Sequence, residues 1–118
     1  MHDIVIRSGR VIDPETCLDV VCDVAIDDGK ISIVGEVSKN GRTEIDANGM
    51  VVAPGFIDLH AHGQSLPADR MQAFDGVTTA LELEVGALPV GDWYTAQKAK
   101  PRLLNYGTAA AWIFARKA

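Results

Sequence analysis

Hydrophobic and polar positions alternate with a period of two through most of the first fifty residues. Short runs of β-branched residues are separated by polar turns, and no helical period occurs among them. The pair Asp28-Gly29 favours a tight hairpin turn between its flanking segments. We expect extended segments at residues 3–7, 10–13, 19–27, 30–37, 44–46 and 50–53. This pattern predicts a small antiparallel β-sheet, which is too thin to bury much of a core by itself.

The pattern changes after Pro54-Gly55, where candidate strands begin to alternate with candidate helices. Pro67 suits the first turn of one helix, and Asp92 is a plausible N-cap for the next. We expect strands at residues 56–62, 77–85 and 103–113, with helices at 65–75 and 93–100; the alanine-rich last strand could also be helical. A βαβαβ order is the unit of a parallel sheet. The sequence therefore predicts an α/β protein with a boundary near Ala53-Pro54, separating a β-rich domain at 1–53 from a βαβαβ domain at 54–118.

Candidate chemistry is concentrated in residues 51–62, VVAPGFIDLHAH. Side chains alternate along a strand, so the i, i+2 spacing of His60 and His62 places both imidazoles on one face, together with Phe56 and Asp58. Two imidazoles that converge at the end of a strand can form part of a divalent-metal site.

The next predicted strand has the same division into faces. Glu82 and Glu84 share a face with Thr78 and Ala80, whereas the opposite face is almost wholly apolar. We expect helices to cover the apolar faces of both strands, and the faces that carry His60, His62 and three carboxylates to point into a barrel interior or crevice. Buried carboxylates need a cation or strong donors, which favours a metal site. In the alternative, Glu82 pairs with an arginine or lysine and Glu84 lies in solvent.

Composition and charge limit the classes of partner. The hydrophobic share of 47% is typical of a globular protein, and the net charge of −5 is spread along the chain without a basic block. This distribution disfavours nucleic acid and anionic membranes as partners. No apolar run approaches the roughly 20 residues of a membrane span, and charged residues interrupt the first ten positions. Cys17 and Cys22 are two isolated thiols that fit no common zinc motif, and free thiols are typical of the reducing cytosol. We therefore expect a soluble cytoplasmic protein.

Several of these segments resemble the metal-dependent amidohydrolase superfamily. The run 51–62 is similar to its first barrel strand, and DIVIRSGRVIDPET, DVAIDDGKISIVGE and IDANGMVVAPGFIDLHAH look like its amino-terminal region. AFDGVTTALELEVG, at 73–86, resembles the second strand in the branch of D-aminoacylases and N-acyl-D-amino-acid (D-glutamate) deacylases. The resemblance covers essentially the whole chain. It implies a (β/α)8 TIM-like barrel with a flanking β-sandwich, so 1–53 would be part of an incomplete sandwich and 54–118 the first strands and helices of an incomplete barrel.

The resemblance also implies a reaction: metal-dependent hydrolysis of a non-peptide C–N (amide) bond, such as deacylation of an N-acyl-D-amino acid, by metal-activated water. His60 and His62 match the family's two first-strand histidine ligands for zinc or a similar divalent ion. Glu84 lies near the position of a second-strand ligand, often cysteine in that branch; without a gap, Val85 aligns with it. Catalytic and substrate-binding residues stay unassigned.

The chain departs from the family in length. Members of the superfamily are several times longer and take further ligands and a general base from later strands. Three parallel strands cannot close a barrel, and the open edges would favour pairing with another copy. We therefore expect a homo-oligomer, with exchange of elements as one way to cover the edges. The sequence leaves open whether the chain is an enzyme: the alternative is a truncated, catalytically inactive fragment that acts as an oligomeric or binding module.

Overall fold

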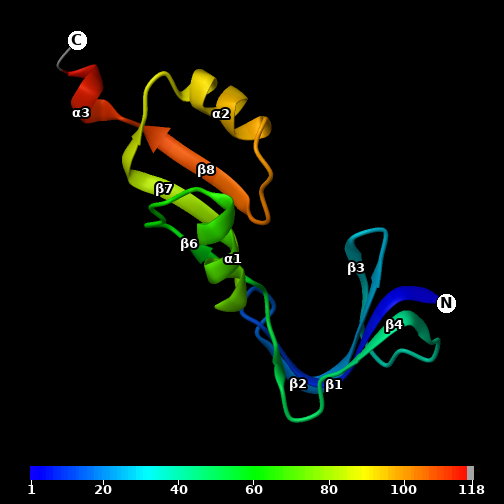
Figure 1. The fold of residues 1–118 in the computed structure, drawn as a ribbon. Helices are drawn as coiled ribbons and strands as arrows, with labels where there is room; N and C mark the ends of the chain where they lie inside the picture. The colour runs from blue at the N-terminus through cyan, green and yellow to red at the C-terminus, as the bar shows by residue number, and fades with distance from the viewer. Residues whose placement is uncertain (117–118) are drawn as a thin grey trace. The chain divides into compact units, whose positions relative to one another are not determined.

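The computed structural model describes residues 1–116, which fall into two compact units (Figure 1). The first ends at Pro54 and the second begins at Gly55. Residues 117 and 118 of the predicted second domain lie outside the described residues. The assignment of the units to an incomplete sandwich and an incomplete barrel stays a prediction. Within residues 1–116, no helix is long and apolar enough to cross a membrane.

The first unit is one five-stranded sheet. It contains β1 (His2–Asp13), β2 (Leu18–Asp27), β3 (Lys30–Gly35), β4 (Gly41–Asp46) and β5 (Val51–Val52). The strand order is β3-β2-β1-β4, and β5 also pairs with β1. The predicted antiparallel pairing is correct for β1, β2 and β3, but β4 and β5 are parallel to β1, so the sheet is mixed. The reason is that the chain after β3 passes to the other edge of β1 and runs there in the same direction as β1.

The strand β1 is continuous, although the sequence predicted two separate segments. A register shift lies between Ile6 and Gly9, and Ser8 between them has a φ of 58°. This bulge lets the strand bend and continue. Gly9 also approaches β5 closely, since a Cβ at this position would lie 2.5 Å from Cγ2 of Val52. The predicted Asp28-Gly29 turn is confirmed, with φ values of 50° and 71°.

Arg7 connects several elements of this unit. Its Nη1 donates hydrogen bonds to Asp23 of β2 (2.9 Å) and to the carbonyl of Val37 (2.6 Å). Its Nη2 donates to the carbonyl of Lys39 (3.1 Å) and to Glu44 of β4 (2.9 Å). The side chains of Glu44 and Asp23 raise the pKa of this guanidinium. One half-buried cation thereby joins β1 to both of its neighbours.

The second unit has the predicted βαβαβ order. It contains β6 (Phe56–Asp58), α1 (Leu66–Phe74), β7 (Val77–Ala87), α2 (Val90–Lys98), β8 (Asn105–Ala110) and α3 (Trp112–Ala115). The strands form a parallel sheet in the order β6-β7-β8 (Figure 1). The segment 103–113 was predicted to be a strand that could also be helical. It contains the strand β8 and the first residues of the helix α3, so each interpretation is right for part of the segment.

Several predicted element ends differ from the structure by a few residues, and two of them concern the site strand and the second helix. The strand predicted at 56–62 ends at Asp58, because the Asp58 carboxylate accepts the backbone N–H of His60 (3.0 Å) and so competes with the strand ladder. The helix predicted to begin after Asp92 begins at Val90, with Pro89 as its N-cap residue. Asp92 therefore lies in the first helical turn, where its negative charge interacts favourably with the positive end of the helix dipole.

The expectation that helices cover the apolar strand faces was wrong for much of β6 and β7. Ile57 of β6 is 61% exposed, and Leu83 and Val85 of β7 are 45% and 49% exposed. The buried cluster in this unit consists of small and medium side chains: Ala61, Ala80 and Leu104. The cause is that too few helical residues are available to cover the sheet. A parallel sheet needs helices on both faces, and α1 and α2 have only nine residues each.

A buried ion pair holds the helices of the second unit to the start of β8. Asp69 of α1 is fully buried, and its two carboxylate oxygens accept from Nε (2.7 Å) and Nη2 (2.8 Å) of Arg102. The backbone N–H of Leu103 donates to the same carboxylate (3.1 Å). Gln64 and Gln97 accept from Nη1 of Arg102 (3.2 and 3.3 Å). Burial raises the pKa of Asp69, but Arg102 and the Leu103 N–H outweigh it and hold the pKa below its usual value.

We predict that Asp69→Asn lowers the free energy of unfolding by about 3–5 kcal/mol, because it leaves the Arg102 charge buried without its partner. Asp75→Asn is a matched control at the exposed end of α1 and should change the stability by less than about 0.5 kcal/mol. Urea denaturation followed by circular dichroism measures both values. Equal effects of the two substitutions would show that the ion pair does not stabilise this unit.

Candidate metal centre

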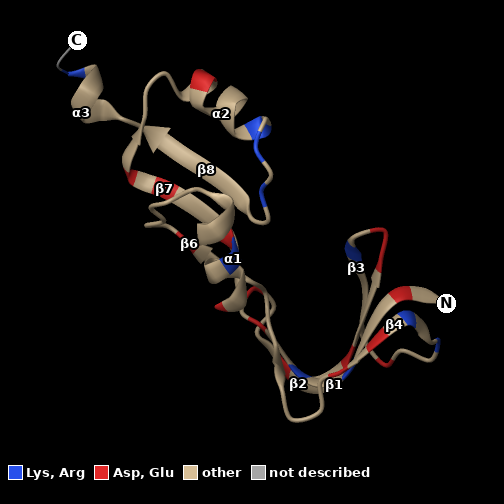
Figure 2. Cartoon of the chain, viewed as in Figure 1, with Lys and Arg blue, Asp and Glu red and all other residues tan. Residues whose placement is uncertain are grey.

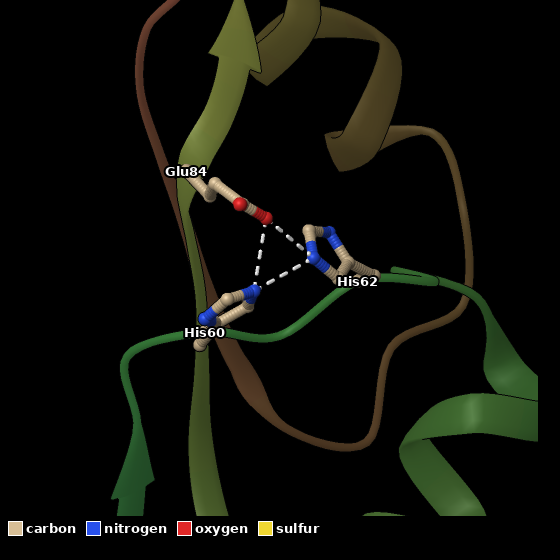
Figure 3. Close-up of side chains that lie close together, drawn as sticks. All are labelled: His60, His62 and Glu84. Carbon is tan, nitrogen blue, oxygen red and sulfur yellow. Dashed lines mark hydrogen bonds and ion pairs between the residues drawn. The ribbon is translucent and has the colours of Figure 1, made fainter.

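The register between β6 and β7 determines which residues meet beyond the end of β6. Ile57 pairs with Thr79 and Asp58 with Ala80, and an isolated β-bridge joins His60 to Glu82. The backbone N–H of Ala61 donates to the carbonyl of Leu81 (2.9 Å), which keeps the segment after β6 beside β7. The same offset brings His62 next to Glu84 (Figure 3).

The three residues predicted as metal ligands lie together. The Nε2 atoms of His60 and His62 are 2.9 Å apart, and each lies 2.9 Å from Oε2 of Glu84. Figure 3 shows the two rings and the carboxylate pointing toward one another from the segment after β6 and from β7. Their side chains are 66%, 51% and 58% exposed for His60, His62 and Glu84, so the group lies on an open surface and not in the crevice that the sequence predicted.

The donor atoms suit a divalent metal ion. Imidazole nitrogens and a carboxylate oxygen are common zinc ligands, and ligand atoms around a tetrahedral zinc are about 3.3 Å apart. The observed separations of 2.9 Å would need to widen by a few tenths of an ångström, a small change for exposed side chains. Without a cation, two facing Nε2 atoms at 2.9 Å need a proton between them. The residues therefore fit a metal ion; that they bind one stays a prediction.

Glu82 contacts His62 on the other side of the imidazole ring. Its Oε2 lies 2.6 Å from Nδ1 of His62, and its Oε1 accepts the backbone N–H groups of Glu84 (3.1 Å) and Val85 (3.0 Å). Its partner is therefore this histidine, and not the arginine or lysine considered from the sequence. Acidic residues mark this end of β7 in Figure 2.

These contacts shift two pKa values. The hydrogen bond and the charge of Glu82 raise the pKa of His62. Burial raises the pKa of Glu82, but the N–H of Val85 and the imidazole of His62 outweigh it, so its pKa lies below the usual value. Both shifts favour the ionised carboxylate beside His62.

Asp58 does not join the group formed by His60, His62 and Glu84, although the sequence placed it on the same face as the two histidines. Its Oδ1 accepts the His60 N–H and its Oδ2 accepts from Nε2 of Gln72 in α1 (3.1 Å). Asp58 therefore shapes the backbone that carries His60. The short Asp-x-His spacing was the available sequence signal for this role, because aspartate side chains often accept the N–H two residues ahead.

The sequence model of the Amidohydrolase family matches residues 43–117, a stretch that includes His60, His62 and Glu84. The dihydroorotase of Streptococcus pneumoniae serotype 4 is 52% identical over 60 residues, which are 50% of this chain and 14% of that protein.

Two similar solved structures cover more of this chain. The N-acyl-D-glutamate deacylase of Bordetella bronchiseptica, complexed with zinc and a phosphonate inhibitor, has a TM-score of 0.79 and 26% identity over 93% of this chain. A D-aminoacylase has a TM-score of 0.75 and 27% identity over 90% of this chain. The chain spans 29% of the length of each of these two structures.

Proposed function

The chain belongs to the amidohydrolase family, and from this membership we propose that His60, His62 and Glu84 bind one divalent metal ion in the service of amide-bond hydrolysis. The observation that carries the proposal is the convergence of three ligand atoms at mutual distances of 2.9 Å. Three N and O ligands from the protein leave room for water or substrate in a catalytic zinc site.

Zinc is the metal we propose, because it accepts two imidazoles and a carboxylate and because the similar deacylase structure contains zinc. When bound, such an ion lowers the pKa of a water ligand and polarises the carbonyl of an amide. The chain's own part is to present the Nε2 atoms of His60 and His62 and the Oε2 atom of Glu84 to one point, and to keep that point open to solvent.

The proposed substrate is a small N-acyl-D-amino acid, with no role for nucleic acid or a membrane. Support comes from the D-aminoacylase and the N-acyl-D-glutamate deacylase, which resemble this chain over nine-tenths of its length. The proposed reaction is hydrolysis of the non-peptide C–N bond, which releases the acyl group as a carboxylate and the amino acid with a free amine.

A second candidate is a metal-binding module without turnover. Among residues 1–116, His60, His62 and Glu84 are the one group that brings three potential ligands together. The other histidine, His2, belongs to the first unit, where it lies 2.7 Å from Asp27. No described residue is assigned as general base, which favours binding over catalysis for these residues alone.

Self-association is the partner interaction that we propose. In the second unit β6 is an edge strand, and its Ile57 is 61% exposed. An exposed edge with apolar side chains favours pairing with another strand. A second copy of this chain, with or without exchanged elements, would supply that strand.

The function is tested with zinc-loaded protein and N-acetyl-D-glutamate. We expect about one zinc per chain, release of D-glutamate detected as a free amine, and loss of both after chelation. Glu84→Gln and His60→Ala should lower the zinc content and the rate, whereas the matched control His2→Ala should keep both. Zinc binding without turnover would favour the second candidate; the absence of bound zinc would contradict both.

Self-association is tested by light scattering over a range of concentrations. We expect a mass of at least twice 12.6 kDa, and a shift toward the monomer in Ile57→Lys, because a lysine on an edge strand opposes pairing. Thr95→Lys, an exposed substitution in α2, is the control and should keep the oligomer. A stable monomer at working concentration would rule out the oligomer.

A further inference from the structure

We propose that Glu82 is a positioning residue that fixes neutral His62 in the tautomer with its proton on Nδ1, so that the Nε2 lone pair faces His60 and Glu84. The inference rests on the proposed metal site and deepens it, because only an unprotonated Nε2 can bind a metal ion. Nothing in the alternating sequence pattern assigned this role to Glu82.

The geometry separates the two nitrogens of the His62 ring. Nδ1 lies 2.6 Å from Oε2 of Glu82, whereas Nε2 lies 2.9 Å from Oε2 of Glu84 and 2.9 Å from Nε2 of His60. A carboxylate accepts hydrogen bonds and does not donate them when it is ionised. Each ring nitrogen thus faces a carboxylate, but the contact of Nδ1 with Glu82 is the shorter one, and a neutral ring carries a single proton. That proton lies on Nδ1, in the hydrogen bond to Glu82, which leaves the Nε2 lone pair toward the metal position. A carboxylate in this place also raises the basicity of a metal-binding histidine.

Glu82 is itself held in place, unlike the proposed ligands. Its side chain is 15% exposed, against 58% for Glu84. Its Oε1 accepts two backbone N–H groups from the same strand, those of Glu84 and Val85. These contacts restrict the carboxylate, so Oε2 is presented to His62 from a fixed position. The two roles on β7 are thus distinct: Glu84 points toward the ligand group, and Glu82 supports one of its members.

The hydrogen-bond donors around Glu82 determine how Glu82→Gln would change the tautomer of His62. Backbone N–H groups can only donate, so in Glu82→Gln the single amide oxygen must stay with the N–H groups of Glu84 and Val85. The amide nitrogen then faces Nδ1 of His62 and donates to it. Nδ1 becomes an acceptor, and the proton of the neutral ring moves to Nε2, where it blocks metal binding. A role limited to stabilising the strand would leave the tautomer of His62 unchanged.

The test uses nitrogen-15 NMR of metal-free protein at a pH where His62 is neutral. We expect the Nδ1–H tautomer in the wild type and the Nε2–H tautomer in Glu82→Gln. Zinc titration should give a dissociation constant roughly 10–100-fold weaker in Glu82→Gln. Glu36→Gln, an exposed glutamate in the first unit, is the matched control and should change neither the tautomer nor the affinity.

The outcomes separate this inference from the proposed function. An Nε2–H tautomer in the wild type would overturn the role of Glu82, and this measurement needs no variant to fold. An unchanged tautomer and affinity in Glu82→Gln would overturn it as well. A wild type with the Nδ1–H tautomer that binds no zinc would overturn the proposed function, while the switch of tautomer in Glu82→Gln would still support the positioning by Glu82.

Discussion

The parallel pairing of β6 with β7 limits which side chains can meet beyond the end of β6. Because side chains alternate along each strand, a slip of one residue would turn Glu84 away from His60 and His62. The His60–Glu82 bridge and the Ala61–Leu81 hydrogen bond hold this register after β6 itself has ended. The arrangement of His60, His62 and Glu84, the proposed metal ligands, therefore depends on backbone pairing, and the side chains can stay exposed without losing it.

Polar interactions have two different roles in the second unit. Asp69 and Arg102 are buried and fully paired, and they hold α1 to the start of β8. His60, His62 and Glu84 are exposed, and their acceptor atoms crowd together at distances that a cation would relieve. The buried pair joins α1 to the segment before β8, whereas the exposed group is the proposed metal site. Glu82 lies between these extremes, since it is mostly buried and contacts one proposed ligand.

The alternation of hydrophobic and polar residues predicted most of the strands and the residues of the proposed metal site. What it missed depends on interactions between residues far apart in the sequence. Period two placed His60 and His62 on one strand's face and Glu84 on the corresponding face of the next strand, and the alternation of strands and helices predicted the parallel sheet. The pairing of Asp69 with Arg102 joins residues 33 positions apart, which no local pattern reveals. The parallel addition of β4 and β5 to β1 is likewise non-local. Asp58 ended β6 early because its side chain competes with the strand ladder.

One divalent ion is proposed to bind between His60, His62 and Glu84. X-ray absorption at the zinc edge of the zinc-loaded chain tests this claim most directly. We expect a nearest shell of nitrogen and oxygen alone, at about 2.0–2.1 Å, with outer scattering from two imidazole rings. Sulfur at about 2.3 Å would instead place the ion at Cys17 or Cys22, and a spectrum without imidazole scattering would also contradict the claim.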